Sequence, residues 1–406
     1  MKNLLIILNG SFPDILDTGG KQAVYNMIDY LRWKINISIL YKDGLQHNNT
    51  TALELTKKWN NVKFYKYIED KRDVKYISYF TKRLAYKFFG NPTSRLNREI
   101  ENEQIIYSRT IDLIMNIINK EQIDIVQTEF SEGINYVYAL PSTIKKVFIQ
   151  HEIRFVRNEL MLQQNAKSNT LSKYLIKKNK SEEIAAMNQY DSIVVFTEID
   201  KAKLLDAGVK VPIHVSPVCI STNNNKKEFI ASKHELSFLG GANHKPNLLG
   251  MEWFLDNVWP IILQKDNKIR LKIIGNWPYE IRNKFINKYK NISFSGIVKD
   301  LATVLPGSIM VIPITVGSGM RMKALEAIAN GCTIISTSVG IEGLPFISGT
   351  DSIIADDKDT FANSILSLLN NPNRQKTFWY NSMQWYKEKY SKEALGDIRL
   401  NIYTNL

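Results

Sequence analysis

Short apolar runs alternate along this chain with longer stretches in which apolar residues recur at helical spacing. Runs of four to seven mostly apolar residues are typical of strands that are buried on both faces. A regular alternation of such strands with helices predicts parallel sheets, so the fold class expected is α/β. The predicted strands fall into two series, at residues 4–8, 35–41, 123–129, 146–150, 192–196 and 211–220, and then at 235–239, 270–275, 292–298, 309–314 and 332–336.

A polar, asparagine-rich stretch at residues 221–228 separates the two series and has the composition of a linker. We therefore predict an N-terminal domain at residues 1–222 and a second domain at 223–375. Residues 376–406 are predicted to be C-terminal helices that cross back to the first domain. The large side chains suggesting that packing are Trp379, Trp385 and Tyr386.

One stretch, residues 309–331, combines the features of a phosphate site. Its apolar run predicts a buried strand, and Gly317 and Gly319 then supply residues that are free to adopt positive φ. From Met320 onward the apolar residues recur at helical spacing, so a helix is expected to begin there. A strand, a glycine turn and a helix N-terminus together present free backbone N–H groups and the positive end of a helix dipole.

Charged residues in the same stretch strengthen this interpretation. Arg321 and Lys323 add positive charge at the start of the helix, and Glu326 lies one turn further in, where it suits a pair of sugar hydroxyls. An ordinary strand–helix turn with solvated cations would explain the glycines and cations alone. The strand expected at residues 332–336 completes a βαβ unit, and such sheets bind ligands at the carboxyl ends of their strands.

Similar turns recur elsewhere in the chain. Gly240 and Gly241 follow the first strand of the second domain, and Lys245 lies at the approach to the next helix. In the first domain, Gly19 and Gly20 precede a predicted helix, although a tight helix entry would equally explain this pair. A histidine, His151, follows the strand at 146–150 and is therefore expected at a carboxyl end of the first sheet.

The totals exclude several classes of protein. The net charge of +13 fits an anionic substrate, an anionic membrane surface or nucleic acid, but no zinc-finger spacing or single-strand-binding aromatic pattern supports nucleic acid. The two cysteines, Cys219 and Cys332, are far apart and suggest neither a disulfide framework nor a metal site. This cysteine usage fits a reducing cytoplasm, so a cytoplasmic protein is expected. The longest apolar stretches are too short for a transmembrane helix.

The motifs resemble the donor site of family-4 GT-B glycosyltransferases. The resemblance is carried by the segment from Gly317 to Glu326, by residues 329–332, by residues 336–344, and by the Phe-Leu-Gly-Gly-Ala-Asn-His-Lys-Pro-Asn phrase at 238–247. It covers nearly all of the second half of the chain, and the first half only through its layout, the Gly19–Gly20 pair and His151. It implies a GT-B fold of two Rossmann-like domains that face a central cleft.

The resemblance also implies roles for particular residues. In that family the counterpart of Glu326 holds the nucleotide ribose, the helix start faces the diphosphate, and the turn at Gly296 contacts the base through main-chain groups. A strand-end histidine, here His151, borders the donor sugar and the acceptor. The family usually carries a second glutamate where this chain has Ser318, although a Gly-Ser-Gly form recurs in one branch. His151 and Glu326 are thus the expected catalytic residues, and the expected donor-binding residues are Gly19, Gly20, Gly240, Gly241, Lys245, Gly296, Val298, Ser318, Gly319, Met320, Arg321, Lys323 and Glu326.

The expected activity is transfer of a sugar from a nucleotide diphosphate, such as a UDP or GDP sugar, to a hydroxyl of a glycan, lipid-linked or protein-linked acceptor. The family implies retention at the anomeric carbon and no metal or other cofactor. Two alternatives remain at this stage: a nucleotide-sugar epimerase on the same fold, and a non-catalytic sugar-nucleotide binder. A nucleic-acid binder is a third alternative, based on charge alone.

One segment suggests an attachment to membranes. Residues 76–89 interleave aromatic side chains with Lys82, Arg83 and Lys87, as a helix lying at an anionic membrane surface does. The same helix would also be explained by aromatic residues that dock on their own domain. The membrane interpretation suits a family with many members acting on lipid-linked acceptors at the inner face of the membrane, in polysaccharide biosynthesis.

Overall fold

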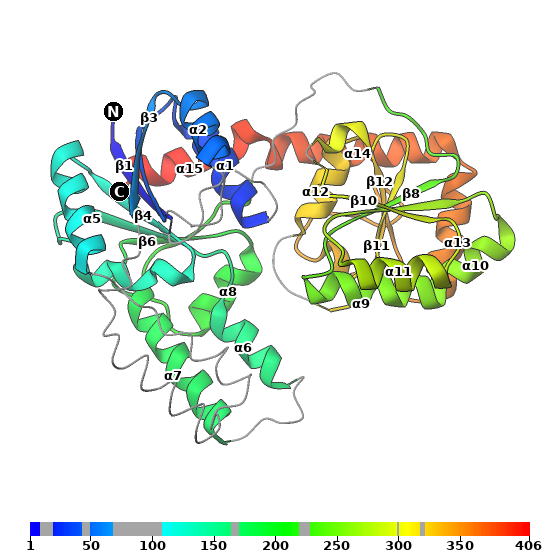
Figure 1. Ribbon diagram of the computed structural model, residues 1–406, viewed down its shortest axis with the longest axis horizontal. Coiled ribbons are helices and arrows are strands. Elements are labelled where there is room, and N and C mark those ends of the chain that lie inside the picture. Colours follow the sequence, from blue (N-terminus) through cyan, green and yellow to red (C-terminus); the bar gives the residue numbers. More distant parts are fainter. Residues whose placement is uncertain are drawn as a thin grey trace. The chain divides into compact units, whose positions relative to one another are not determined.

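The computed structural model describes residues 1–8, 19–42, 49–67, 108–163, 170–218, 228–298, 300–316 and 321–406. These residues form two compact units (Figure 1). Unit 1 comprises Met1–Ile15, Met27–Pro217 and Gly396–Leu406, and unit 2 comprises Leu16–Asn26 and Val218–Leu395. Both ends of the chain thus belong to unit 1.

Unit 1 is built on a seven-stranded parallel sheet in the order β3-β2-β1-β4-β5-β6-β7. The strand β1 (Asn3–Leu8) lies inside the sheet, between β2 and β4, and its residues Leu4 to Leu8 are almost completely buried, as their apolar run predicts. The remaining strands are β2 (Asn36–Lys42), β3 (Val62–Tyr67), β4 (Ile125–Glu129), β5 (Lys145–Ile149), β6 (Ser192–Val195) and β7 (Ile213–Val215).

Helices cover this sheet. They are α2 (Asn49–Lys58), α5 (Ser108–Glu121), the 3-10 helix η1 (Ser131–Ala139), α6 (Arg154–Gln163), α7 (Thr170–Met187) and α8 (Glu198–Asp206), with the last residues of α1 (Gly19–Leu31) and part of α15 (Lys392–Thr404). The Thr197 side chain caps α8 by accepting a hydrogen bond from the backbone N–H of Asp200 at 3.0 Å.

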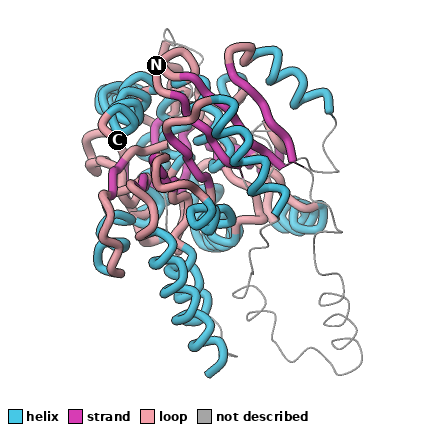
Figure 2. The backbone as a smooth tube through the Cα atoms, turned by 90° about the vertical axis from the view of Figure 1, so that its left-hand side faces the viewer, coloured by secondary structure: helices cyan, strands magenta, loops and turns pink. Residues whose placement is uncertain are grey.

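Unit 2 is built on a six-stranded sheet in the order β10-β9-β8-β11-β12-β13. Its helices α9 and α11 lie on one face of the sheet and α12 and α14 on the other (Figure 1). This division follows from right-handed crossovers, because the chain moves outward from β8 in one direction and from β11 in the other. Figure 2 shows strands of unit 1 with helices beside them. The strands of the unit 2 sheet are β8 (Glu235–Leu239), β9 (Arg270–Ile274), β10 (Ile292–Gly296), β11 (Ile309–Ile312), β12 (Thr333–Ser336) and β13 (Ile353–Ile354).

The helices of unit 2 enclose one large apolar core. They are α9 (Lys245–Trp253), the π-turn η2 (Phe254–Val258), α10 (Trp259–Lys265), α11 (Tyr279–Lys288), the short η3 (Leu301–Thr303) and η4 (Val339–Ile341), α12 (Met322–Ala329), α13 (Lys358–Leu369) and α14 (Pro372–Tyr390). Phe254, Trp259 and Phe361 are at most 1% exposed in this core.

One packing prediction is wrong. Trp379, Trp385 and Tyr386 of α14 were expected against the first domain, but all three pack within unit 2. The Trp379 indole donates to the backbone oxygen of Ile328 at 3.0 Å, the Trp385 indole donates to Asp351 at 3.0 Å, and Tyr386 belongs to the unit 2 core. The C-terminal residues that join unit 1 begin only at Gly396.

Two further points concern the limits of elements. The helix α1 begins at Gly19 itself, so the Gly19–Gly20 pair forms the first residues of the helix and does not precede it. Residues 76–89, the predicted membrane-surface helix, lie outside the described ranges, so the membrane interpretation stays a prediction. Among the helices that the structure describes, none is both long enough and apolar enough to span a bilayer.

Candidate functional site

The sheet of unit 2 has one point where the order of its strands reverses, between β8 and β11. Both strands are parallel, so their carboxyl ends lie at the same edge, and loops that leave a sheet in opposite directions open a crevice at this edge. The loop at residues 240–244 follows β8, and the start of α12 follows β11. The described residues that were predicted to bind a donor in the second domain therefore converge on this edge.

The loop after β8 requires glycine at its first two positions. Gly240 has φ +149°, and a Cβ atom there would lie 2.5 Å from the Asn247 amide nitrogen. A Cβ atom on Gly241 would lie 2.9 Å from the backbone oxygen of Asn276. The Trp277 indole N–H fixes the same loop by donating to the Gly240 carbonyl at 2.8 Å. At these two glycines the backbone is therefore held close to its neighbours, and no Cβ atom stands between it and a ligand.

Asn247 links this loop to the helix on the other side of the reversal point. It is 5% exposed, donates from Nδ2 to the Gly241 carbonyl at 2.9 Å, and accepts from the Lys323 ammonium at 2.5 Å. Sequence reasoning quoted Asn247 only as the end of a motif and assigned it no role. The signal available in the sequence was its position, because Asn247 lies at the start of the helix that follows the Gly240–Gly241 turn.

Two ionisable groups of α12 have strongly perturbed pKa values. Burial is the largest cause in both cases: it lowers the pKa of Lys323 to about 7 and raises the pKa of Glu326 to about 7. Arg321 lowers the pKa of Lys323 further, whereas a hydrogen bond from Gln22 and the charge of Lys323 oppose the rise at Glu326. Lys323 also lies over the Phe238 ring, with its ammonium 5.0 Å from the ring centroid.

The third charged residue, Arg321, stands at the N-cap position of α12. It is 7% exposed, and burial lowers the pKa of its guanidinium. Its Nη2 atom lies 3.4 Å from the carboxylate of Glu342, a half-exposed residue in the loop after β12. Buried cations whose pKa values are lowered by desolvation gain most from an added anion, so this edge of the sheet favours a ligand that carries negative charge.

The other predicted residues are placed as follows. Gly296 ends β10 with φ +67°, Val298 is partly buried two residues later, and Lys245 is exposed at the first position of α9. Gly19 and Gly20 begin α1. Ser318, Gly319 and Met320 lie outside the described residues, so their predicted contacts with a donor stay predictions.

In unit 1, His151 lies immediately beyond β5, near the carboxyl end of that strand, as predicted. Its Nε2 atom is 2.6 Å from the Glu129 carboxylate, and the two side chains are 10% and 4% exposed. Glu129 is the last residue of β4, whose register places Glu129 opposite Ile149 of β5. The sequence prediction missed Glu129, because the pairing of β4 with β5 is needed to see that the two strand ends are adjacent.

Aromatic rings enclose the imidazole of His151. The Phe130 ring is stacked on it with centroids 4.0 Å apart, and the Phe196 ring meets it edge-on at 5.1 Å. Phe130 adopts φ 65° and ψ 150°, a conformation that costs a residue with a side chain on the order of 1–3 kcal/mol. Strain of this kind persists only where the surroundings impose it, and here it sets the ring against His151.

A buried carboxylate fixes the segment that follows His151. Glu183 of α7 accepts from the backbone N–H groups of Arg154 at 3.3 Å and Phe155 at 3.1 Å, which are the first residues of α6. It also accepts from the Gln150 amide at 3.3 Å, so it holds the chain on both sides of His151. Burial raises the pKa of Glu183 and is the largest cause of its shift.

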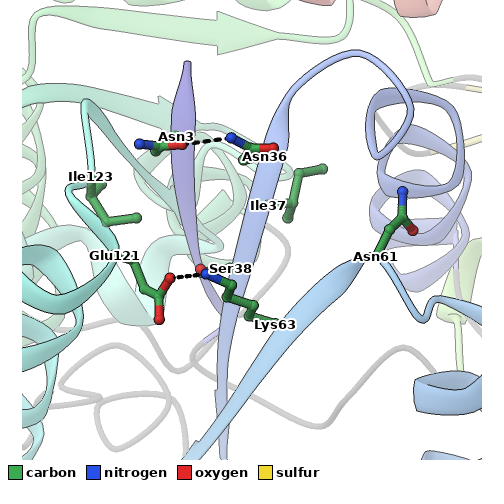
Figure 3. Close-up of a pocket in the computed structure, with 8 residues that line it drawn as sticks. All are labelled: Asn3, Asn36, Ile37, Ser38, Asn61, Lys63, Glu121 and Ile123. Atoms are coloured by element: carbon green, nitrogen blue, oxygen red, sulfur yellow. Dashed lines mark hydrogen bonds and ion pairs between the residues drawn. The ribbon is translucent and has the colours of Figure 1, made fainter. Parts of the chain in front are cut away.

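A small pocket of about 190 Å³ lies at the opposite edge of the unit 1 sheet (Figure 3). Asn3 and Asn36, the first residues of β1 and β2, hydrogen bond to each other there at 2.8 Å, and Lys63 forms an ion pair with Glu121. These polar groups bind one another, and the pocket lies at the amino ends of the strands. It is therefore separate from the carboxyl edge that carries His151.

Comparison with known proteins finds a family match within unit 2. Residues 233–371 match the model of the family described as glycosyl transferases group 1, and they include the predicted donor residues from Gly240 to Glu326. A Klebsiella pneumoniae protein, an uncharacterized 44.6 kDa protein in the cps region, is 28% identical over 214 residues. That alignment spans 50% of this chain and 54% of the relative, so only about half of the relative's length is matched.

Solved structures match the whole chain. S. aureus TarM, in a mutant bound to fondaparinux, alpha-GlcNAc-glycerol and UDP, has a TM-score of 0.68 at 14% identity, covering 99% of this chain and 100% of TarM. The fold is GT-B. Anabaena HepE, in complex with UDP and glucose, has a TM-score of 0.61 at 9% identity, with 100% of both chains covered. The pneumococcal O-GlcNAc transferase GtfA, in complex with UDP and GlcNAc, has a TM-score of 0.61 at 11% identity, covering 100% of this chain and 99% of GtfA.

Proposed function

We propose that this protein is a glycosyltransferase that uses a nucleotide-diphosphate sugar as donor. The observation that carries the proposal is the cluster at the β8–β11 edge of unit 2, where buried Arg321 and partly buried Lys323 lie near a glycine loop. These residues lie within the stretch that matches group 1 glycosyl transferases. The complexes of TarM, HepE and GtfA with UDP support a nucleotide diphosphate as the anion.

Each group in this cluster has a proposed task. Lys323 and Arg321 neutralise the diphosphate, with Lys245 adding charge at the approach, and this stabilises the leaving group as the sugar bond breaks. Glu326 accepts hydrogen bonds from the ribose hydroxyls, and the turn at Gly296 and Val298 contacts the base. We propose that no metal ion is needed, since side-chain cations supply the positive charge that the departing nucleotide requires.

The proposed acceptor is a hydroxyl of a glycan or a lipid-linked sugar, and the proposed stereochemical outcome is retention. His151 is proposed to hydrogen bond the transferred sugar or the acceptor. The cps-region relative supports a role in polysaccharide biosynthesis.

The first test is a thermal-shift panel of nucleotides and nucleotide sugars in the presence of a chelator. A ligand at one hundred times its Kd stabilises the folded state by about 2.7 kcal/mol, which is readily measured. We expect a shift with one nucleotide family in wild-type protein and its loss in Glu326→Ala. The control is Glu388→Ala, which removes an exposed carboxylate of α14 and should keep the shift.

The second test separates the alternative functions. With the selected nucleotide sugar and no acceptor, a transferase hydrolyses the donor slowly, an epimerase converts the sugar without releasing nucleotide, and a non-catalytic binder does neither. Absence of any nucleotide-dependent shift in the panel would contradict the proposed function itself.

A further inference from the structure

Glu129 stands at the centre of a chain of buried polar side chains in unit 1. One carboxylate oxygen is 2.6 Å from His151 Nε2, and the other accepts from the Gln127 amide at 2.6 Å. The Gln127 amide oxygen in turn accepts a hydrogen bond from the Tyr403 hydroxyl of α15. Gln127, Glu129 and Tyr403 are at most 3% exposed. The side chains therefore form a continuous path from the C-terminal helix to the histidine.

The direction of each hydrogen bond in this path is determined by chemistry. A tyrosine hydroxyl that donates to an amide oxygen leaves the NH₂ group of Gln127 as the donor to Glu129. An ionised carboxylate accepts only, so Glu129 must also accept from His151, and Nε2 is the nitrogen that carries the proton. In the neutral imidazole, Nδ1 is then a hydrogen-bond acceptor.

Nδ1 has no assigned partner. It is buried, and no described residue lies within hydrogen-bonding distance of it. A buried polar atom without a partner is unfavourable and is seldom retained without a function. Stacking on the strained Phe130 prevents the ring from turning to find one. Nδ1 is therefore suited to accept a hydrogen bond from a hydroxyl group of a ligand.

The far end of the path is also fixed. Arg399 of α15 is 3% exposed and hydrogen bonds to the Tyr403 hydroxyl, and its Nε atom donates to Ser216 at 3.3 Å. Burial raises the pKa of Tyr403, which keeps its hydroxyl protonated and able to donate. All of these residues belong to unit 1.

We propose that Glu129 is a positioning residue that fixes the tautomer and orientation of His151, with Gln127 and Tyr403 holding Glu129 for that task. The group that Nδ1 receives is a hydroxyl, of the sugar or of the acceptor. This inference rests on the proposed function for its effect on turnover, whereas the tautomer of His151 can be measured without any activity.

The test uses the full-length protein with Glu129→Gln. Because Gln127 must still donate toward position 129, the new amide is expected to turn its oxygen to Gln127 and its NH₂ group to His151. Nε2 then becomes the acceptor, and the proton moves to Nδ1. Two-bond ¹H–¹⁵N spectra of protein labelled at histidine report this change directly, and His151→Gln assigns the signal among the five histidines.

A second variant provides rescue. In Gln127→Glu combined with Glu129→Gln, the carboxylate at 127 accepts from both Tyr403 and the amide NH₂ group at 129, which leaves the amide oxygen free to accept from Nε2. We expect Glu129→Gln to reduce kcat by about 100-fold, as misplacement of a reacting group does, with nucleotide affinity within about twofold of wild type. The double variant should restore the Nε2–H tautomer and recover most of the lost kcat.

The matched control is Glu121→Gln, which removes another buried and paired carboxylate of unit 1, on the opposite edge of the sheet. It should lower the stability of the fold and leave kcat and the His151 spectrum unchanged. A folded Glu129→Gln variant with an unaltered His151 tautomer would overturn the inference, as would a double variant that shows no recovery. If wild-type protein turns over no nucleotide sugar, the proposed function fails and the spectra alone decide this inference.

Discussion

Unit 1 and unit 2 are both parallel sheets in which the order of the strands reverses once, yet the side chains at their carboxyl edges differ in kind. The edge of unit 2 carries buried cations and a glycine loop, whereas the edge of unit 1 carries an imidazole, a carboxylate and aromatic rings. The side chains of unit 2 are suited to stabilising the negative charge of a ligand, not to holding one catalytic group in a fixed orientation. The second set holds one polar group in a fixed geometry and carries little positive charge. A shared topology thus carries two different sets of side chains, for which we propose two tasks, binding in unit 2 and orientation in unit 1.

The largest expected effect tests this separation directly. Lys323→Met should weaken binding of the selected nucleotide by about 10-fold to 150-fold, because a charge-assisted hydrogen bond contributes about 1.5–3 kcal/mol. The protein should remain as stable as wild type at pH 7, since methionine removes a cation whose burial is unfavourable. His151→Ala, in contrast, should lower kcat and leave nucleotide affinity within about twofold.

Titration calorimetry measures both affinities. The control is Lys268→Met, which removes an exposed lysine near the amino end of β9, away from the glycine loop. Equal losses of nucleotide affinity in Lys323→Met and His151→Ala would contradict the division of tasks between the two units.

An intermediate effect is expected from pH. Lys323 has a pKa of about 7 in the free protein, so it is only partly charged at neutral pH. A bound diphosphate favours the charged ammonium and raises this pKa, so binding takes up a proton. Affinity for the nucleotide sugar should therefore fall as pH rises from 7 to 9, by at most about tenfold for each pH unit.

Calorimetry in two buffers with different ionisation enthalpies measures the proton uptake. The same titration with Lys323→Met should show a weaker and flatter dependence on pH over this window. A wild-type affinity that rises with pH would mean that another group, such as Glu326, dominates the linkage.

The smallest effect concerns a residue that lies near the unit 1 edge and has only a structural task. Thr197→Ala should cost about 1 kcal/mol of stability, because the N-cap of α8 is lost, and Thr197→Ser should recover it. Neither variant should change kcat or nucleotide affinity. A large loss of kcat in both would show that the orienting region of unit 1 extends beyond His151 and Phe196. Denaturant unfolding and steady-state rates provide the two measurements.

Much of the fold follows from local pattern. The strand at residues 235–239 was predicted at its observed limits, because its apolar residues are buried on both faces and glycine ends it. The strand β3 was missed, since its alternation of Val62, Phe64 and Tyr65 with lysines lacks a continuous apolar run. Its place at the edge of the sheet explains this, because an edge strand has less apolar neighbour surface to match.

The part of the candidate site that lies in one contiguous motif could be predicted from the sequence. Arg321, Lys323 and Glu326 lie at the N-cap and in the first turns of one helix, so their spacing in the sequence largely sets their spacing in the structure. Glu129 and His151 are brought together by the order of the strands, and Tyr403 reaches Gln127 from a helix 276 positions away. Proximity of that kind depends on the topology, which no local pattern contains.

The three-segment composition of unit 1 has a consequence for biosynthesis. The segment Gly396–Leu406 leaves the ribosome after all of unit 2, yet Gly396 packs so closely on Tyr30 that a Cβ atom would lie 2.1 Å from the ring, and Tyr403 donates to a buried glutamine of β4. The sheet of unit 1 is therefore translated first, but its last contacts can form only after unit 2 has left the ribosome. A protein of this design reverses the usual N-terminal-first order of domain completion, and the geometry around His151 is finished last.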